Sequence, residues 1–338
     1  MATEFILKAV TPEGLVFEKP VTFVKLRTEN GDIGILAKHI NFISPIGAGE
    51  MVVRENDKEE VTYYLEGGFL EVRQDKVVIL GVNIVEATKA EAERMAKEVA
   101  IERAKRQKIK EFFKQDTILL AKNLLGKLIL IKKDGKILGG YIVETEAYLG
   151  TEDKACHSFE GKRTPKIEAL FGEAGTVYIY TMHTHKMLNI VSCEKGNPQA
   201  VLIRGIEPVI NVERMIENRG KEGVLVSNGP GKLTKAMGIS DGFNMSKIYE
   251  IKKNLEKELG KLNYNIENMR ENTLYIDFEN SKVPKQIKIS ERIGIPNKGI
   301  WTEKELRYFV AGNKYVSGMK KAEYNDNCWE RSQAPLRT

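Results

Sequence analysis

Two carboxylates and a phenol share one short apolar segment of the chain. In IVETEAYLG, residues 142–150, Glu144, Glu146 and Tyr148 are spaced two positions apart. Successive side chains of a strand point to opposite faces, so an extended segment places these three, with Ile142, on one surface. A carboxylate there can act as a general base toward water, and a tyrosine ring beside it can stack on a planar ligand.

Three of the four histidines, His157, His183 and His185, lie close together in the sequence. On a strand, the rings at positions 183 and 185 share a face. Cys156, His157 and the two glutamates are further candidate ligands, so one interpretation of this region is a metal site. The spacings match no established zinc pattern.

Two other interpretations use the same residues. In the first, Glu146 activates water while Tyr148, His157 and Tyr180 form an aromatic slot for a planar ligand. In the second, Glu144 and Glu146 are ion-paired residues of an edge strand, and the tyrosines are ordinary packing residues.

The whole chain has 338 residues, which exceeds the usual size of one hydrophobic core and predicts two domains. It contains no apolar run near the roughly 18 residues that cross a membrane, and MATEFILKAVTPEG lacks the layout of a signal peptide. We therefore expect a cytoplasmic protein. Cys156, Cys193 and Cys328 form no C-x-x-C pair, which indicates reduced thiols and no disulfide framework.

Charge is distributed unevenly along the chain. Residues 1–100 contain 12 Lys and Arg against 17 Asp and Glu, whereas residues 101–338 contain 41 against 30. The two halves therefore have net charges of −5 and +11. This asymmetry predicts different partners for the halves, with a polyanion as a candidate for the basic one.

The first hundred residues contain short apolar runs separated by turn residues such as Asn30-Gly31, a pattern that predicts a β-sandwich or barrel. After Val85 the sequence becomes rich in Ala, Glu, Lys and Arg, which predicts a long exposed helix. His39 is the only histidine in this half, and we expect it to have a structural or surface role and no chemistry. This half is typical of a binding module.

The segments GDIGILAKHINFISPIGAGEMVV and YYLEGGFLEVRQDKVVIL, followed by a helix, resemble the epsilon subunit of the F-type ATP synthase over about residues 3–112. The resemblance implies a β-sandwich on the central stalk, touching the gamma subunit and the c-ring at the inner face of the membrane. In that family two helices follow and restrain ATP hydrolysis. This chain has room for the first helix only, so we do not expect regulation by a helical hairpin.

The second half mixes strand and helix patterns, which predicts an α+β domain. Ordered blocks from FFKQDTILLAKNLLGKLILI to LRYFVAGNKYVS, about residues 110–317, resemble the alkyladenine, or 3-methyladenine, DNA glycosylase family. The resemblance implies one compact domain on a curved, largely antiparallel sheet, without metal or cofactor. It also implies a monofunctional enzyme that flips an alkylated purine out of double-stranded DNA and hydrolyses its bond to deoxyribose.

The resemblance assigns roles to individual residues. Glu146 matches the catalytic glutamate, and Glu144 is then a structural partner or a like charge that raises the pKa of Glu146. The residues that sandwich the flipped base are matched by Tyr148, His157 and Tyr180. N-alkylated purines are cationic and should stack on such rings more strongly than undamaged purines.

Two further residues of the pocket follow from the same resemblance. Asn189 matches the asparagine that crowds the exocyclic amine of guanine. Arg204 matches an arginine near the attacking water and the target phosphate, with an ion pair to Glu207 as the alternative role.

The sequence departs from the family at the residue that wedges into the gap left by the flipped base. Many relatives have a tyrosine there, whereas YIYTMHTHKMLN offers His183 or Met182. Contacts to DNA phosphates are expected from Arg163, Thr164 and Lys166 in RTPK. Lys232, in SNGPGKLTKAMGI, is expected to bind a phosphate together with the N-terminal amides of a helix.

We therefore predict an α+β multidomain fusion with four parts: a β-sandwich at 1–86, a helix or linker at 87–112, a glycosylase domain at 113–318 and a disordered tail at 319–338. Apolar residues at three- and four-residue spacing predict a helix that covers the core, with Ile248, Ile251, Leu255, Leu259 and Leu262 on one face. The alternative function is an ATP synthase central-stalk epsilon subunit in proton-coupled ATP synthesis, with a passive C-terminal fusion.

Overall fold

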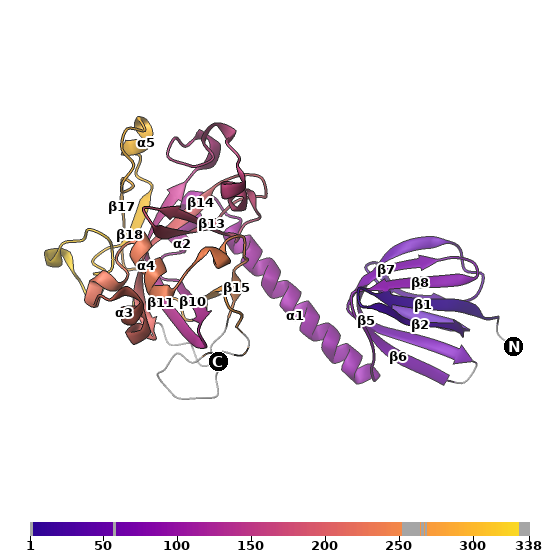
Figure 1. Cartoon of the computed structure of the whole chain (residues 1–338). Helices are drawn as coiled ribbons and strands as arrows, with labels where there is room; N and C mark the ends of the chain where they lie inside the picture. The colour runs from indigo at the N-terminus through magenta and orange to yellow at the C-terminus, as the bar shows by residue number, and fades with distance from the viewer. Residues whose placement is uncertain (1–2, 57–58, 252–263, 265–266, 268, 331–338) are drawn as a thin grey trace. The chain divides into compact units, whose positions relative to one another are not determined.

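The computed structural model describes residues 3–330 apart from 57–58, 252–263, 265–266 and 268 (Figure 1). Its contacts divide the chain into two compact units, Met1–Lys105 and Arg106–Thr338. Each unit has its own hydrophobic core.

The first unit is a β-sandwich, as predicted, and β5 belongs to both of its layers. The first part of β5 pairs with β7, and its second part pairs with β3 and β6. One layer therefore runs β2-β1-β8-β7-β5 and the other β4-β3-β5-β6-β9. The strands are β1 (Phe5–Thr11), β2 (Gly14–Val21), β3 (Phe23–Thr28), β4 (Gly31–Ile35), β5 (Phe42–Asn56), β6 (Glu59–Leu65), β7 (Gly68–Val72), β8 (Lys76–Gly81) and β9 (Ile84–Glu86).

Alternating side chains fill the space between the layers. Phe5, Leu7 and Ala9 of β1 are buried, as are Val77 and Ile79 of the neighbouring β8. This period of two is what a strand with one face toward a core requires.

A long exposed helix follows the sandwich, as the composition predicted: α1 (Lys89–Phe113). It begins with a capping box, in which the Thr88 backbone N–H donates to Glu91 at 2.9 Å and the Glu91 N–H donates back to the Thr88 hydroxyl at 3.3 Å. Phe113, at its end, is completely buried in the core of the second unit. The boundary between the two units therefore falls inside this helix.

The second unit is an α+β domain on a curved sheet with the strand order β12-β13-β14-β11-β10-β16-β15, and β18 also pairs with β11. Among the described strands of this unit, only β15 and β16 pair in parallel. The strands are β10 (Leu128–Lys133), β11 (Lys136–Tyr148), β12 (Val177–Met182), β13 (His185–Val191), β14 (Ala200–Ile210), β15 (Tyr249–Glu250), β16 (Leu274–Asp277), β17 (Ile287–Ser290) and β18 (Arg307–Val310).

Short helices connect and cover these strands. The α-helices are α2 (Thr117–Asn123), α3 (Val212–Arg219), α4 (Pro230–Met237) and α5 (Ile300–Glu303). Three 3-10 helices lie between β11 and β12: η1 (Gly150–Glu152), η2 (Phe159–Gly161) and η3 (Pro165–Phe171). Within the described ranges, every helix is too short or too polar to cross a bilayer.

Strand β11 is central to the second unit. It pairs with β14 on one side, and on the other side with β10 in its first half and with β18 around Glu144–Glu146. Its register to β14 shifts between Ile142 and Glu144 and again between Glu144 and Thr145. Bulges of this kind turn side chains away from strict alternation, and here they occur at the acidic residues.

The predicted disordered tail is wrong for residues 319–330. Cys328 is 5% exposed, and the Trp329 indole N–H donates to Glu207 at 2.9 Å. These contacts hold the segment on the domain, since Cys328 is buried and the indole donates to a half-buried carboxylate. Residues 331–338 lie outside the described part of the chain.

The apolar pattern between Ile248 and Leu262 predicts a helix, but the structure has a strand at the start of this segment. Tyr249 and Glu250 form β15, which pairs with β16, and Ile248 is buried. Backbone pairing to a sheet edge thus replaces the helical hydrogen bonds there. Leu255, Leu259 and Leu262 lie outside the described residues.

Candidate active site

Two acids of β11 and one arginine of β14 form a buried cluster. The side chains of Glu144 and Glu146 are completely buried, and both contact Arg204. Arg204 Nε lies 3.0 Å from Glu144, and Arg204 Nη1 lies 3.3 Å from Glu146. The strand register passes from Gly205 directly to Ile203, so Arg204 is the extra residue of a bulge facing the acids.

Both carboxylate oxygens of Glu144 accept hydrogen bonds from protein donors. It accepts from Arg204, from Arg307 Nε at 2.7 Å, and from the Ser317 backbone N–H at 2.7 Å and hydroxyl at 2.6 Å. These bonds hold Arg204 in place and occupy the carboxylate of Glu144. The alternative pairing of Arg204 with Glu207 is wrong, because Glu207 instead binds Lys282.

Glu146 has three neighbours of a different kind. One carboxylate oxygen accepts from the Ile293 backbone N–H at 2.8 Å and contacts Arg204, and the other accepts from the Tyr148 hydroxyl at 2.9 Å. Burial raises the pKa of Glu146, and Glu144 adds to this, whereas Arg204, the Ile293 N–H and Tyr148 oppose it. The net direction is upward, because desolvation penalises the charged form most.

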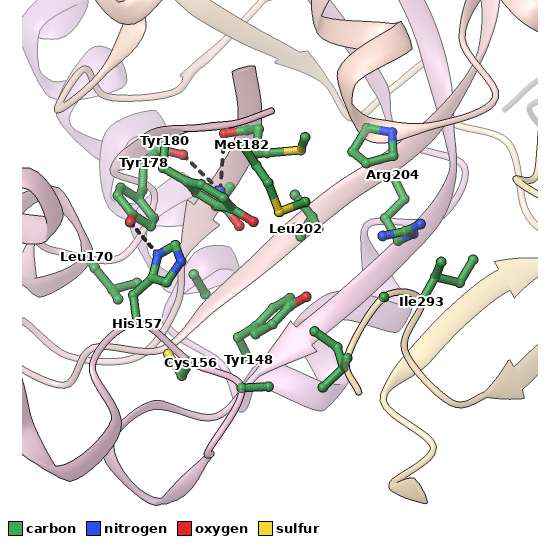
Figure 2. A pocket seen from close by; sticks show the side chains of 17 residues that line it. Tyr148, Cys156, His157, Leu170, Tyr178, Tyr180, Met182, Leu202, Arg204 and Ile293 are labelled. Carbon is green, nitrogen blue, oxygen red and sulfur yellow. Dashed lines mark hydrogen bonds between the residues drawn. The ribbon is translucent and has the colours of Figure 1, made fainter. Parts of the chain in front are cut away.

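A cavity of about 120 Å³ adjoins this cluster (Figure 2). Tyr148, Arg204 and Ile293, the three residues that contact Glu146, all line it. Glu146 is not among the lining residues, so its carboxylate meets the cavity through these three. The other walls are mainly aromatic and apolar, and they include Cys156, His157, Leu170, Tyr178, Tyr180, Met182, Met187, Asn189 and Leu202. We call this cavity the aromatic pocket.

The aromatic residues of the pocket contact one another. The ring centroids of His157 and Tyr180 are 4.6 Å apart at a steep angle, and His157 Nδ1 is hydrogen-bonded to the Tyr178 hydroxyl at 2.8 Å. His157 is open to solvent on one side, yet the surrounding protein and Lys162 lower the pKa of its imidazole. Burial raises the pKa of Tyr180 to about 12. At neutral pH these walls are therefore uncharged.

Asn189 is fixed in orientation. Its amide nitrogen donates to the backbone oxygens of Tyr178 and Met187, both at 3.2 Å. These two bonds use both amide hydrogens, so the side-chain oxygen is the polar atom that Asn189 offers to a ligand.

Met182 and His183 lie at the tip of the β12–β13 hairpin. Met182 is 46% exposed and lines the pocket, while His183 and Thr184 form the turn with positive φ angles of 47° and 70°. Helix α4 packs against this hairpin through Gly231, where a Cβ atom would lie 2.6 Å from the Cβ of His185. The close approach therefore requires glycine. The exposed His183 does not line the pocket.

The predicted phosphate contacts do not line the aromatic pocket itself. Thr164 and Lys166 line a larger adjoining groove of about 1400 Å³, which shares Cys156, His157, Tyr178, Tyr180 and Met182 with the pocket. Arg163 is ion-paired with Glu168. Three more lysines line the groove without having been predicted as contacts, namely Lys154, Lys162 and Lys298. Lys232, at the start of α4, donates to Asn228 at 2.8 Å.

The candidate metal ligands have other partners. The two glutamates bind arginines, and His157 binds Tyr178. In the part of the chain that the structure describes, no three His, Cys, Asp or Glu side chains are grouped so as to hold a metal ion.

Several residues of the site could not be found from sequence spacing. Arg307 holds Glu144, Ile293 donates its backbone N–H to Glu146, and Arg292 and Asp153 form a buried ion pair beside Tyr148. Arg292, Ile293 and Arg307 lie about 150 positions from the acids in sequence, and one contact uses only the backbone. The only signal for the two arginines in the sequence was that each is a charged residue at or beside a short apolar strand.

Comparison with known proteins places the second unit in the class of DNA glycosylases. Residues 111–314 match the methylpurine-DNA glycosylase (MPG) family, and the chain belongs to this family. Residues 4–87 match the β-sandwich domain of the ATP synthase delta/epsilon chain. The resemblances predicted for both halves are thereby confirmed.

Two bacterial relatives agree with the assignment of the second unit. A protein of Staphylococcus saprophyticus, described as a candidate 3-methyladenine DNA glycosylase, is 46% identical over 213 residues, covering 63% of this chain and 95% of that protein. A Staphylococcus aureus protein of the same description is 42% identical over 222 residues, covering 65% and 100%. A chain in the mitochondrial ATP synthase structure of Euglena gracilis is 27% identical, covering 32% of this chain and 68% of that one, with a TM-score of 0.27.

Removal of the charge should destabilise the protein to different extents at the two acids. Glu144→Gln leaves Arg204 and Arg307 buried without their carboxylate, so we expect a loss of about 3–5 kcal/mol in unfolding free energy. Glu146→Gln should cost far less near neutral pH, because burial already disfavours the charged form of Glu146. Urea denaturation of the second unit measures both. Equal losses would contradict the separate roles.

Proposed function

We propose that this DNA glycosylase excises alkylated purines from double-stranded DNA by binding the flipped nucleotide in the aromatic pocket and activating a water molecule with Glu146. The observation that carries the proposal is the placement of Glu146. It is a buried carboxylate with a raised pKa, held by Arg204, the Tyr148 hydroxyl and the Ile293 N–H at one end of the pocket.

Base flipping follows from the depth of the site. A stacked base cannot reach a buried carboxylate, so the nucleotide must leave the duplex, at a cost of a few kcal/mol that is smaller for a damaged base. Electron-rich rings of Tyr148 and Tyr180 stack well on a cationic alkylated purine. The neutral imidazole of His157 adds a flat surface without repelling that cation. The oxygen of Asn189 accepts from a donor on the base edge.

The chemistry is a hydrolysis with water as the nucleophile. The bond between C1′ and the base nitrogen breaks, its electron pair leaves with the base, and positive charge develops on the sugar. Glu146 stabilises this charge and takes a proton from the water whose oxygen bonds to C1′. Arg204 keeps Glu146 oriented and faces the target phosphate. The products are the free base and an abasic site, with no strand cleavage and no covalent enzyme intermediate.

Lysines are the proposed source of DNA affinity. Lys166 and Thr164, with the three additional lysines of the groove, lie next to the mouth of the aromatic pocket, where the flanking phosphates of a flipped nucleotide would be. Lys232 adds a cation at the α4 N-terminus. Arg163 would exchange its exposed pair with Glu168 for a phosphate, which costs little because surface ion pairs are weak.

Replacement of the catalytic carboxylate tests the proposal directly. Glu146→Gln should lower the single-turnover rate of 3-methyladenine release from methylated DNA by about 10²–10⁴-fold, because an amide cannot accept the proton of water. DNA affinity, measured separately, should stay within a few-fold. Release at the wild-type rate would overturn the role of Glu146.

The rate should also depend on pH in a defined direction. Burial raises the pKa of Glu146 above its ordinary value of 4.5, and the mechanism needs the ionised form. The rate is therefore expected to fall as the pH drops through that raised pKa, at a higher pH than for a glutamate in water. Single-turnover rates between about pH 4.5 and 8, at saturating enzyme, measure this fall in rate, which we call the acid limb of the pH–rate profile. A rate that is constant down to pH 4.5 would contradict it.

The hairpin tip is the proposed wedge. His183→Ala should weaken excision from duplex DNA far more than from single strands, because only the duplex leaves a gap to fill. Met182→Ala serves as the comparison, since Met182 also lines the pocket. Equal losses on both substrates for His183→Ala would exclude it as the wedge.

A second function is supported by the match of residues 4–87. We propose that residues 1–112 bind the gamma subunit and c-ring of an ATP synthase, which would place the chain at the inner face of the membrane. Co-purification of the intact chain with the gamma subunit tests this, independently of base excision.

A further inference from the structure

A second buried ion pair lies behind the aromatic pocket. Arg292 and Asp153 have no solvent-exposed side-chain surface, and they meet through two parallel bonds of 2.6 and 2.9 Å. This fork-to-fork geometry fixes the guanidinium in both position and plane.

The pair joins separate segments of the site. Arg292 donates to the backbone oxygen of Ala147 at 3.0 Å, next to Glu146, and to that of Trp301 at 3.2 Å. Asp153 accepts from the backbone N–H groups of Leu149 and Ala155. The loop that leads to His157 is thereby attached to the end of β11.

Arg292 also adjoins two of the three groups that contact Glu146. Its guanidinium carbon lies 4.7 Å from the centre of the Tyr148 ring, and Tyr148 donates to Glu146. The next residue, Ile293, supplies the backbone N–H that donates to the other oxygen of Glu146 at 2.8 Å. The position of Arg292 therefore determines where both donors lie.

Stability alone does not account for this arrangement. A buried ion pair is often no better than apolar residues of the same volume. Here Arg292 Nε is also buried and has no partner among the described residues, which is a further cost. What the Arg292–Asp153 pair does provide is a fixed position for the segment that contacts Glu146.

We infer that Arg292, held by Asp153, is a positioning residue that sets the Ile293 N–H and the Tyr148 hydroxyl against the carboxylate of Glu146. This inference rests on the proposed function of Glu146. It adds one requirement to that function. Arg292, which contacts neither the attacking water nor the flipped base, has to keep the aromatic pocket and the Glu146 carboxylate in a fixed relative position.

Arg292→Lys is the principal variant, because lysine keeps the charge and loses the fork. The single-turnover rate should fall by about 100-fold, the usual cost of a small misplacement, with DNA affinity unchanged within about twofold. The acid limb of the rate should move to higher pH, since a lost Ile293 N–H contact removes an influence that lowers the pKa of Glu146. Displacement of the Tyr148 hydroxyl acts in the same direction, because its hydrogen bond also lowers the pKa of Glu146. The other groups acting on Glu146 or on the neighbouring Tyr180 stay in place: Arg204, Glu144 and Tyr180 itself.

Asp153→Asn is the second variant, since it keeps the side-chain shape and removes the charge that holds Arg292. It should change the rate and the acid limb in the same directions. Arg214→Lys is the matched control, because Arg214 also pairs with acids, Asp134 and Glu217, but at the surface of the same unit. The control should leave both quantities unchanged.

Hydrogen exchange separates this inference from the proposed function. In folded Arg292→Lys, the Ile293 amide should exchange more than about tenfold faster than in the wild type, whether or not the enzyme is active. If Glu146→Gln excises normally, the proposed function fails and the exchange result still tests the positioning. A rate loss without movement of the acid limb, an unchanged Ile293 exchange rate, or unfolding of both variants would overturn the inference.

Discussion

The second unit depends on burying two carboxylates of one strand inside its core. Burying an isolated carboxylate is prohibitive, and paired charges are tolerated only when their remaining hydrogen-bonding positions are filled. Glu144 meets this condition with Arg204, Arg307 and Ser317. Glu146 meets it less completely, which is why burial dominates its pKa. Two neighbours on one strand thus differ: the carboxylate of Glu144 is fully engaged by protein donors, whereas that of Glu146 has a raised pKa.

The bulges of β11 and β14 are what make this cluster possible. In a regular antiparallel ladder Arg204 would have a partner of its own across the strand, whereas here it is the extra residue opposite the acids. The rest of the pocket is built without charge, from tyrosines of high pKa and an imidazole of low pKa. Charge is thus confined to the end of the aromatic pocket near Glu146 and Arg204, where a reaction at the sugar would need it. The uncharged aromatic walls are suited to a flat cation.

Sequence reasoning placed Glu144, Glu146 and Tyr148 on one surface, because period-two alternation survives between them despite the bulges. It also predicted the sandwich, the exposed helix and the α+β class from local patterns. It could not find Arg292 or Arg307, since no spacing rule links residues that are so distant in the chain. The ordered segment at Cys328 and Trp329 was missed for the same reason: its partner, Glu207, belongs to β14. Local pattern predicts elements, while buried polar contacts depend on how they pack.

The anchoring of Trp329 on Glu207 has a consequence for synthesis of the chain on the ribosome. The sandwich contains all its strands by Glu86 and can fold while the remainder is still being translated. The second unit obtains β18, which pairs with Glu144–Glu146, only after Val310, and the indole that caps Glu207 only at position 329. Burial of Glu144 and Glu146 by β18 therefore has to wait until residues 307–310 have been synthesised, long after the first strands of the same sheet.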